Sequence, residues 1–285
     1  MANQLKTLLL LGLLSGLILF IGGAVGGKGG LIIALFFALI MNVGSYWFSD
    51  KLVLRMYRAR EVSPSEAPGL HQMVDELARE AGIPKPRVCI IPGDAPNAFA
   101  TGRNPENGVV AVTEGIVGLL SRDELKAVLA HEIGHIKNRD ILVQTVAGVL
   151  ASVVMFLANM AQWAAIFGSF GSNSDEDSPN PIAGLLLAIL APIAATLIQM
   201  AISRSREYLA DSTGARLSHN PLALARALEK LSAYNARGGM TSGSEATAHM
   251  FIVHPFTGSR VASLFSTHPP TEERVRRLRE MAAGR

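Results

Sequence analysis

The chain has 285 residues, of which 49% are hydrophobic, and a formal net charge of +3. Its mean hydropathy is positive and its apolar residues gather in long runs, which excludes an ordinary soluble domain and indicates a membrane protein. Cys89 is the single cysteine, which excludes an internal disulfide and a cysteine-based zinc site. We expect no nucleic-acid partner.

The first two apolar runs predict an N-terminal transmembrane hairpin within residues 1–49. They cover about 8–25 and 31–48, and a glycine-rich turn at 26–30 separates them. Each run is close to the ~20 helical residues that a bilayer core requires. The alternative interpretation of the first run is a cleaved signal peptide, because a lysine precedes a leucine-rich stretch.

Two later runs predict a second transmembrane hairpin at 141–202. They cover about 141–167 and 182–202, and the loop at 171–180 between them carries acidic residues and no lysine or arginine. We therefore expect four transmembrane helices and an acidic external loop.

The distribution of basic residues predicts which parts face the cytoplasm. The second and fourth predicted spans are each followed by basic residues, namely Lys51, Arg55, Arg58, Arg60, Arg204 and Arg206. The positive-inside rule then places the polar segments 50–140 and 203–285, and both termini, in the cytoplasm. We expect these two segments to form one catalytic domain.

The polar segments predict an α+β arrangement. Helical spacing of apolar residues predicts helices at 68–81, 221–233 and 271–281. Short segments rich in β-branched or aromatic residues predict the strands of a small antiparallel sheet at 87–91, 97–101 and 108–113.

One further helix carries a metal-binding motif. Ser121 followed by Glu124 forms a capping box, and we expect the helix to continue through His131-Glu132-Ile133-Gly134-His135 and run on into the third span. The two histidines, four residues apart, lie on one helical face and can hold one metal ion. Glu132 beside them suits a general base.

A third ligand is expected from another part of the chain, since catalytic zinc usually takes three protein ligands. Glu207, shortly after the fourth span, lies at about the same predicted height above the membrane as His135. Asp211 follows at i+4 and suits a carboxylate that orients a ligand imidazole. The alternative is that Glu207 and Asp211 form a solvated face with neighbouring arginines.

With these motifs the chain resembles the HtpX membrane peptidases, relatives of the CAAX prenyl-protein peptidases. The resemblance includes NAFATG at 97–102, HEIGHIKNRD ending at Asp140, SREYLAD at 205–211 and STHPP at 266–270. It implies a zincin-like, gluzincin-type α+β catalytic domain with one Zn²⁺ per chain.

The resemblance also implies roles for individual residues. His131, His135 and Glu207 correspond to the zinc ligands and Glu132 to the catalytic base. The substrate-binding edge strand corresponds to Asn97, Ala98, Phe99 and Ala100. His268 corresponds to a histidine that stabilises the oxyanion, and the alternative is a helix start stiffened by the two prolines that follow it. No role is predicted for His249 and His254.

The implied activity is that of a zinc metalloendopeptidase in the bacterial inner membrane. Its partners would be unfolded or damaged membrane proteins and the lipid bilayer, in quality control. The alternative is a membrane metal-binding or transport protein without peptidase activity, which would need ligands inside its spans. The predicted spans contain no Asp, Glu or His.

Overall fold

The computed structural model describes residues 2–141, 206–237, 252 and 269–284. Several predicted features lie outside these residues, namely the third and fourth spans, the acidic loop at 171–180, His249, His254 and His268.

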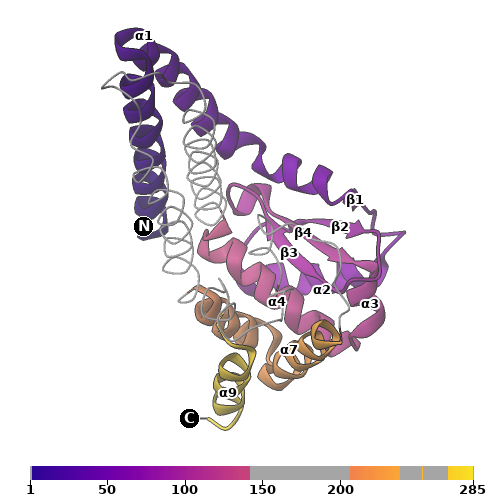
Figure 1. The fold of residues 1–285 in the computed structure, drawn as a ribbon. Coiled ribbons are helices and arrows are strands. Elements are labelled where there is room, and N and C mark those ends of the chain that lie inside the picture. Colours follow the sequence, from indigo (N-terminus) through magenta and orange to yellow (C-terminus); the bar gives the residue numbers. More distant parts are fainter. Residues whose placement is uncertain (1, 142–205, 238–251, 253–268, 285) are drawn as a thin grey trace.

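Helix α1 (Ala2–Met56) consists of two helical arms that meet at Gly27, whose backbone is not helical (φ 54°, ψ −137°). The break falls within the turn predicted at 26–30, and the second arm leaves the first at an angle (Figure 1). The second arm exposes many large apolar side chains, namely Leu31, Ile32, Ile33, Leu35, Phe36, Phe37, Leu39, Ile40, Trp47 and Phe48. Among the described residues, no helix has a stretch that is both long and apolar enough to cross a membrane.

A four-stranded sheet follows, in the order β1-β2-β4-β3. Its strands are β1 (Arg60–Glu61), β2 (Arg87–Ile91), β3 (Ala98–Thr101) and β4 (Val109–Thr113). The prediction of an antiparallel sheet is wrong in one pairing, because β2 and β4 run parallel, whereas β1 with β2 and β3 with β4 are antiparallel. The sheet is therefore mixed. The reason is that β4 inserts between β2 and β3, where it is buried along its whole length.

Each face of the sheet packs against helices. On one face, Val88, Ala98, Val110 and Val112 join the main core with residues of α2 (Pro68–Ala81) and α4 (Arg122–Asn138). On the other face, Cys89, Ile91, Phe99, Val109 and Ala111 pack against Val53 and Leu54 at the end of α1 and against Tyr57 just after it. Burial on both faces fixes the position of the sheet relative to α4.

Helix α4 carries the predicted motif and starts at the predicted capping box. Ser121 Oγ accepts a hydrogen bond from the backbone N–H of Glu124, and Glu124 Oε2 accepts one from the N–H of Ser121. The prediction that this helix runs on into a membrane span is wrong. It ends at Asn138, because Arg139 adopts the left-handed conformation (φ 56°) and its N–H bonds to the carbonyls of His135 and Ile136.

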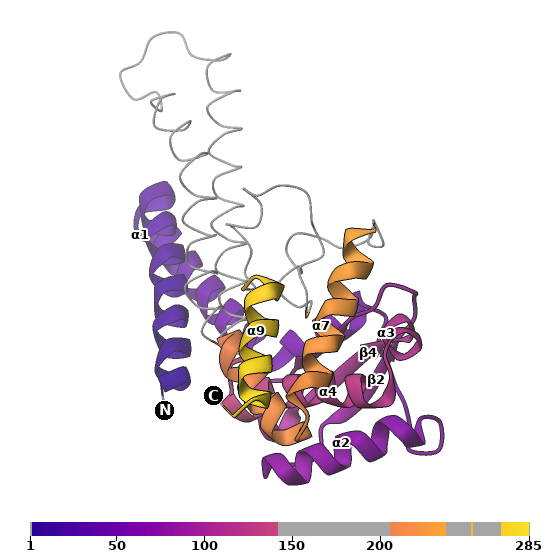
Figure 2. The ribbon, with the colours of Figure 1, turned by 90° about the horizontal axis from the view of Figure 1, so that it is seen from below.

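Further helical elements lie among the described residues. They are α3 (Glu114–Leu119), a 3₁₀ turn at Pro105–Asn107, a helical segment at 206–218, α7 (Pro221–Ala236) and α9 (Thr271–Ala282). Helices α7 and α9 pack side by side, and α7 contacts α4 (Figure 2). Glycines allow the segment 206–218 to approach α4 closely. A Cβ at Gly134 would lie 3.4 Å from Ala210 O, and one at Gly214 would lie 2.8 Å from His131 Cα.

Candidate active site

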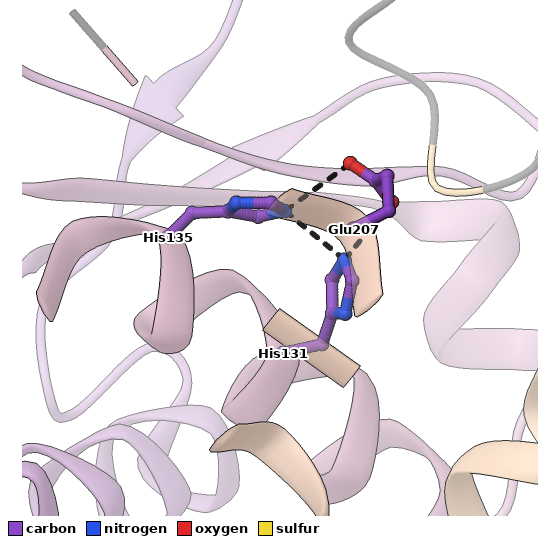
Figure 3. Close-up of side chains that lie close together, drawn as sticks. All are labelled: His131, His135 and Glu207. Carbon is purple, nitrogen blue, oxygen red and sulfur yellow. Dashed lines mark hydrogen bonds and ion pairs between the residues drawn. The ribbon is translucent and has the colours of Figure 1, made fainter. Parts of the chain in front are cut away.

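Three side chains converge between α4 and the segment 206–218 (Figure 3). His131 Nε2 lies 3.1 Å from His135 Nε2, and Glu207 Oε2 and Oε1 lie 3.7 and 3.6 Å from these two nitrogens respectively. A tetrahedral zinc site with bonds of about 2.0–2.1 Å separates its ligand atoms by about 3.3–3.4 Å. The side chains are at most 7% exposed. Both the spacing and the donor types therefore fit one zinc ion.

A second carboxylate lies behind each histidine of this trio. Asp211 Oδ1 lies 2.9 Å from His131 Nδ1, and Asp140 Oδ2 lies 3.0 Å from His135 Nδ1. With Nδ1–H directed at a carboxylate, each ring presents Nε2 to the shared point. Burial alone lowers the pKa of His135, but the carboxylates of Asp140, Glu207 and Glu132 together outweigh it and raise the pKa to about 10.

Two buried arginines lie beside these carboxylates. Arg274 donates to both oxygens of Asp211, at 2.8 and 2.7 Å, and Arg206 donates to the main-chain oxygen of Asp140 at 3.3 Å. Burial raises the pKa of Asp211, yet the Arg274 guanidinium and His131 together more than offset this and hold the pKa at about 2. Burial lowers the pKa of Arg206 to about 10. Asp211 therefore stays ionised behind His131.

Glu132, which follows the first histidine, is buried and contacts the sheet. Its Oε2 accepts a hydrogen bond from the backbone N–H of Ala100 in β3, at 2.8 Å. Burial raises the pKa of Glu132, and the neighbouring Glu207 carboxylate adds to the rise, whereas His131 and His135 oppose it. A carboxylate with a raised pKa accepts a proton more readily near neutral pH.

The predicted substrate strand lies beside Glu132. Asn97, Ala98 and Phe99 are buried, and the ring of Phe99 packs at 5.3 Å from that of Tyr57. The side chain of Asn97 is engaged internally, since its Oδ1 accepts from the N–H of Ile252 at 3.4 Å. Ala100 is the residue of this set that contacts the active-site carboxylate.

The sequence interpretation missed three features of this site: Asp140, Arg274 and Gly214. Asp140 was part of a quoted motif, but its role depends on the left-handed turn at Arg139 that folds it back to His135. The signal for Gly214 was an isolated glycine within a helical segment. No local pattern distinguishes Arg274 from the exposed arginines of its helix.

The site combines two imidazoles on one helix, a carboxylate from a distant segment and a separate acidic side chain beside a small sheet. This combination defines a metallopeptidase of the zincin class. The model of Peptidase family M48 matches residues 64–282. The chain belongs to peptidase family M48. It is a metalloprotease whose cofactor is zinc, as predicted from the motif.

Full-length relatives agree with this assignment. The Protease HtpX homolog of Syntrophobacter fumaroxidans is 60% identical over 282 residues, covering 99% of this chain and 100% of that protein. The Protease HtpX homolog of Persephonella marina is 59% identical, covering 98% of both chains. The predicted HtpX resemblance is confirmed.

A solved structure shows the same fold. The crystal structure of S. mikatae Ste24p superposes with a TM-score of 0.54 at 22% sequence identity, over 97% of this chain. This chain spans 65% of the length of that protein.

Proposed function

We propose that this metalloprotease is an endopeptidase that cuts extended polypeptide laid along the outer edge of β3, with Glu132 as general base. The observation that carries the proposal is the 2.8 Å hydrogen bond from Ala100 N–H to Glu132 Oε2. It joins the outer edge of a strand to the carboxylate beside the metal ligands.

The register of β3 supports its use as a template for substrate. Asn97 directs its carbonyl toward β4, where it accepts from Thr113 N–H at 2.9 Å. Backbone groups alternate along an antiparallel strand, so those of Ala98 and Ala100 point away from β4. Among the described strands, β3 has β4 as its only neighbour. Because the N–H of Ala100 already donates to Glu132, an extended peptide would add to this edge through the backbone groups of Ala98 and the carbonyl of Ala100, with little dependence on sequence.

The chemistry assigned to the chain is proton transfer by Glu132. His131, His135 and Glu207 would hold the zinc ion, which when bound would supply a Lewis acid to a peptide carbonyl and to the attacking water. Glu132 takes the proton of that water and delivers it to the leaving amide nitrogen. The proposed oxyanion group is His268, which lies outside the described residues.

A membrane setting and membrane-protein substrates are part of the proposal. The exposed apolar side chains of the second arm of α1, from Leu31 to Phe48, support insertion into a bilayer. We propose four spans with the boundaries given above, a cytoplasmic active site in an inner membrane, and unfolded or damaged membrane proteins as substrates. The catalytic parts are then residues 50–140 and 203–285, with the spans within 1–49 and 141–202.

The test compares wild type with Glu132→Gln, both purified as full-length chains in detergent. We expect equal zinc content and a loss of about 10²–10⁴-fold in cleavage of an unfolded membrane protein. Glu80→Gln, an exposed glutamate on α2, is the matched control and should cleave like wild type. Undiminished cleavage by Glu132→Gln would refute the proposed base.

A further inference from the structure

Arg274 is a charged side chain that is completely enclosed, at 1% exposure, on the last helix of the chain. Its neighbours on α9, Arg276 and Arg277, are about half exposed and pair with Glu273 on the same helix. A guanidinium is seldom buried unless every donor direction is satisfied. The contacts of Arg274 therefore indicate the role of this buried side chain.

One side of the guanidinium makes two hydrogen bonds to Asp211. Arg274 Nε donates to Oδ2 at 2.8 Å and Nη2 donates to Oδ1 at 2.7 Å. This two-point contact fixes the plane of the carboxylate, which a single ammonium group cannot do. Oδ1 is also the atom that lies 2.9 Å from His131 Nδ1. The orientation of the imidazole therefore depends on a carboxylate that Arg274 holds in place.

The other side of the guanidinium reaches toward the substrate strand. Arg274 Nη1 donates to the main-chain oxygen of Ile252 at 2.7 Å and lies 3.5 Å from Glu207 Oε2. The N–H of Ile252 in turn donates to Asn97 Oδ1, and Asn97 immediately precedes β3. Arg274 thus contacts the metal site and, through one residue, the start of the strand beside Glu132.

We propose that Arg274 is a positioning residue that orients His131 through Asp211 and, through Ile252, ties the C-terminal helix to the start of β3. It contacts neither substrate nor water in this role. The part concerning β3 rests on the proposed function, whereas the part concerning His131 does not.

The experiment measures zinc affinity by competition with a chelator, and the absorption of the Co²⁺-substituted full-length chain, for Arg274→Lys. Lysine keeps the charge but loses the two-point contact. We expect zinc affinity to fall about 10–100-fold and the Co²⁺ spectrum to shift, while the zinc-free protein melts near the wild-type temperature. Arg276→Lys, two residues away on the exposed side of α9, is the matched control and should match wild type in both measurements.

Combination with Asp211→Asn separates orientation from general stabilisation. If Arg274 acts through Asp211, the double variant should bind zinc no more weakly than the weaker of the two single variants. Full additivity of the two losses would overturn the proposal, as would wild-type zinc affinity and an unshifted Co²⁺ spectrum in Arg274→Lys.

A second variant covers the case in which Arg274→Lys does not fold. Arg274→Met with Asp211→Asn removes both buried charges together and keeps an acceptor oxygen for His131. Zinc affinity equal to that of Asp211→Asn alone supports the proposal, and either a further loss or wild-type affinity overturns it. None of these readouts depends on cleavage, so failure of Glu132 as the base would leave them unaffected.

Discussion

Gly214 packs against the backbone of His131 so closely that a Cβ at Gly214 would lie 2.8 Å from both the Cα and the N of the histidine. The two helical segments that carry the proposed metal ligands therefore touch backbone to backbone. This contact sets the distance between Glu207, which lies two turns before Gly214, and the two histidines of α4.

Gly214→Ala is expected to force these two segments apart. Overpacking of this kind costs about 1–3 kcal/mol, and here it displaces Glu207 from the histidines. We expect a lower melting temperature and weaker zinc binding. Gly118→Ala in α3, where a Cβ would meet nothing within 4 Å, is the control and should be neutral or stabilising. A Gly214→Ala protein with unchanged zinc affinity would contradict this account of the helix contact.

Glu207→Ala is expected to abolish stoichiometric zinc binding, since it removes one of the three proposed ligands and leaves two histidines on one helix. The measurement is zinc per chain by atomic spectroscopy after dialysis. Normal zinc content would remove Glu207 from the ligand set. Glu229→Ala, an exposed glutamate on α7, should retain its zinc.

Asp140→Asn is expected to weaken zinc binding less severely, by about 10–100-fold. The amide still fills the space beside His135 but no longer carries the charge that favours Nδ1–H as the donor. Chelator competition measures the change. Asp123→Asn, at the exposed start of the same helix, should have no effect, and equal affinities in these two variants would argue against a role for Asp140.

Asn97→Ala is expected to raise KM while zinc content stays at the wild-type level. The substitution removes the oxygen that accepts from Ile252 N–H and so loosens the start of β3, where substrate is proposed to bind. Steady-state cleavage of a peptide substrate separates KM from kcat. A change confined to kcat would indicate that Asn97 acts on the chemistry instead.

The charge of Glu124 is expected to stabilise the fold at neutral pH and not in acid. Burial alone raises its pKa, but hydrogen bonds from Lys230 and from Ser121 outweigh this, and the pKa lies below its ordinary value. A depressed pKa means that the contribution is complete above the ordinary carboxyl pKa and disappears as the pH falls through the folded-state value.

Glu124→Gln isolates this charge, because glutamine can still accept the capping hydrogen bond from Ser121. We expect the variant to lose about 1 kcal/mol of stability at neutral pH, a modest figure because Lys230 is 45% exposed. Thermal melting of the zinc-free protein from pH 7 to pH 3 provides the measurement. The difference in melting temperature between variant and wild type should disappear in acid. A difference that grew as the pH fell would contradict a stabilising charge at Glu124.

Local patterns predicted most of the catalytic elements. The helix expected at 68–81 is α2 with the same bounds, and the helices expected at 221–233 and 271–281 extend only a few residues further as α7 and α9. The capping box at Ser121 is formed as expected. Periodicity and caps act within a few residues, so they can be recognised without knowledge of the rest of the chain.

Long-range relationships were predicted less completely. The spacing of His131 and His135 predicted that both side chains lie on one helical face. Glu207 was predicted to be the third ligand because it lies at about the same expected height above the membrane as His135. The direction of the β2–β4 pairing was missed, because alternation along a strand carries no information about its neighbour. The turn at Arg139 was also missed, since arginine there has no intrinsic preference for a left-handed conformation.

The amino-acid sequence by itself determined the kind of chemistry: two imidazoles and an acid on one helix specify a metal ion and a base, because helical geometry alone brings them together. The tertiary structure determined which further residues surround that motif and complete the site. It placed Asp140 behind His135, Asp211 and Arg274 behind His131, and Ala100 against Glu132, all through contacts between segments that are separate in sequence or joined by an unexpected turn. Such contacts depend on how helices and sheet pack into one core, and packing is a property of the whole chain rather than of any local stretch.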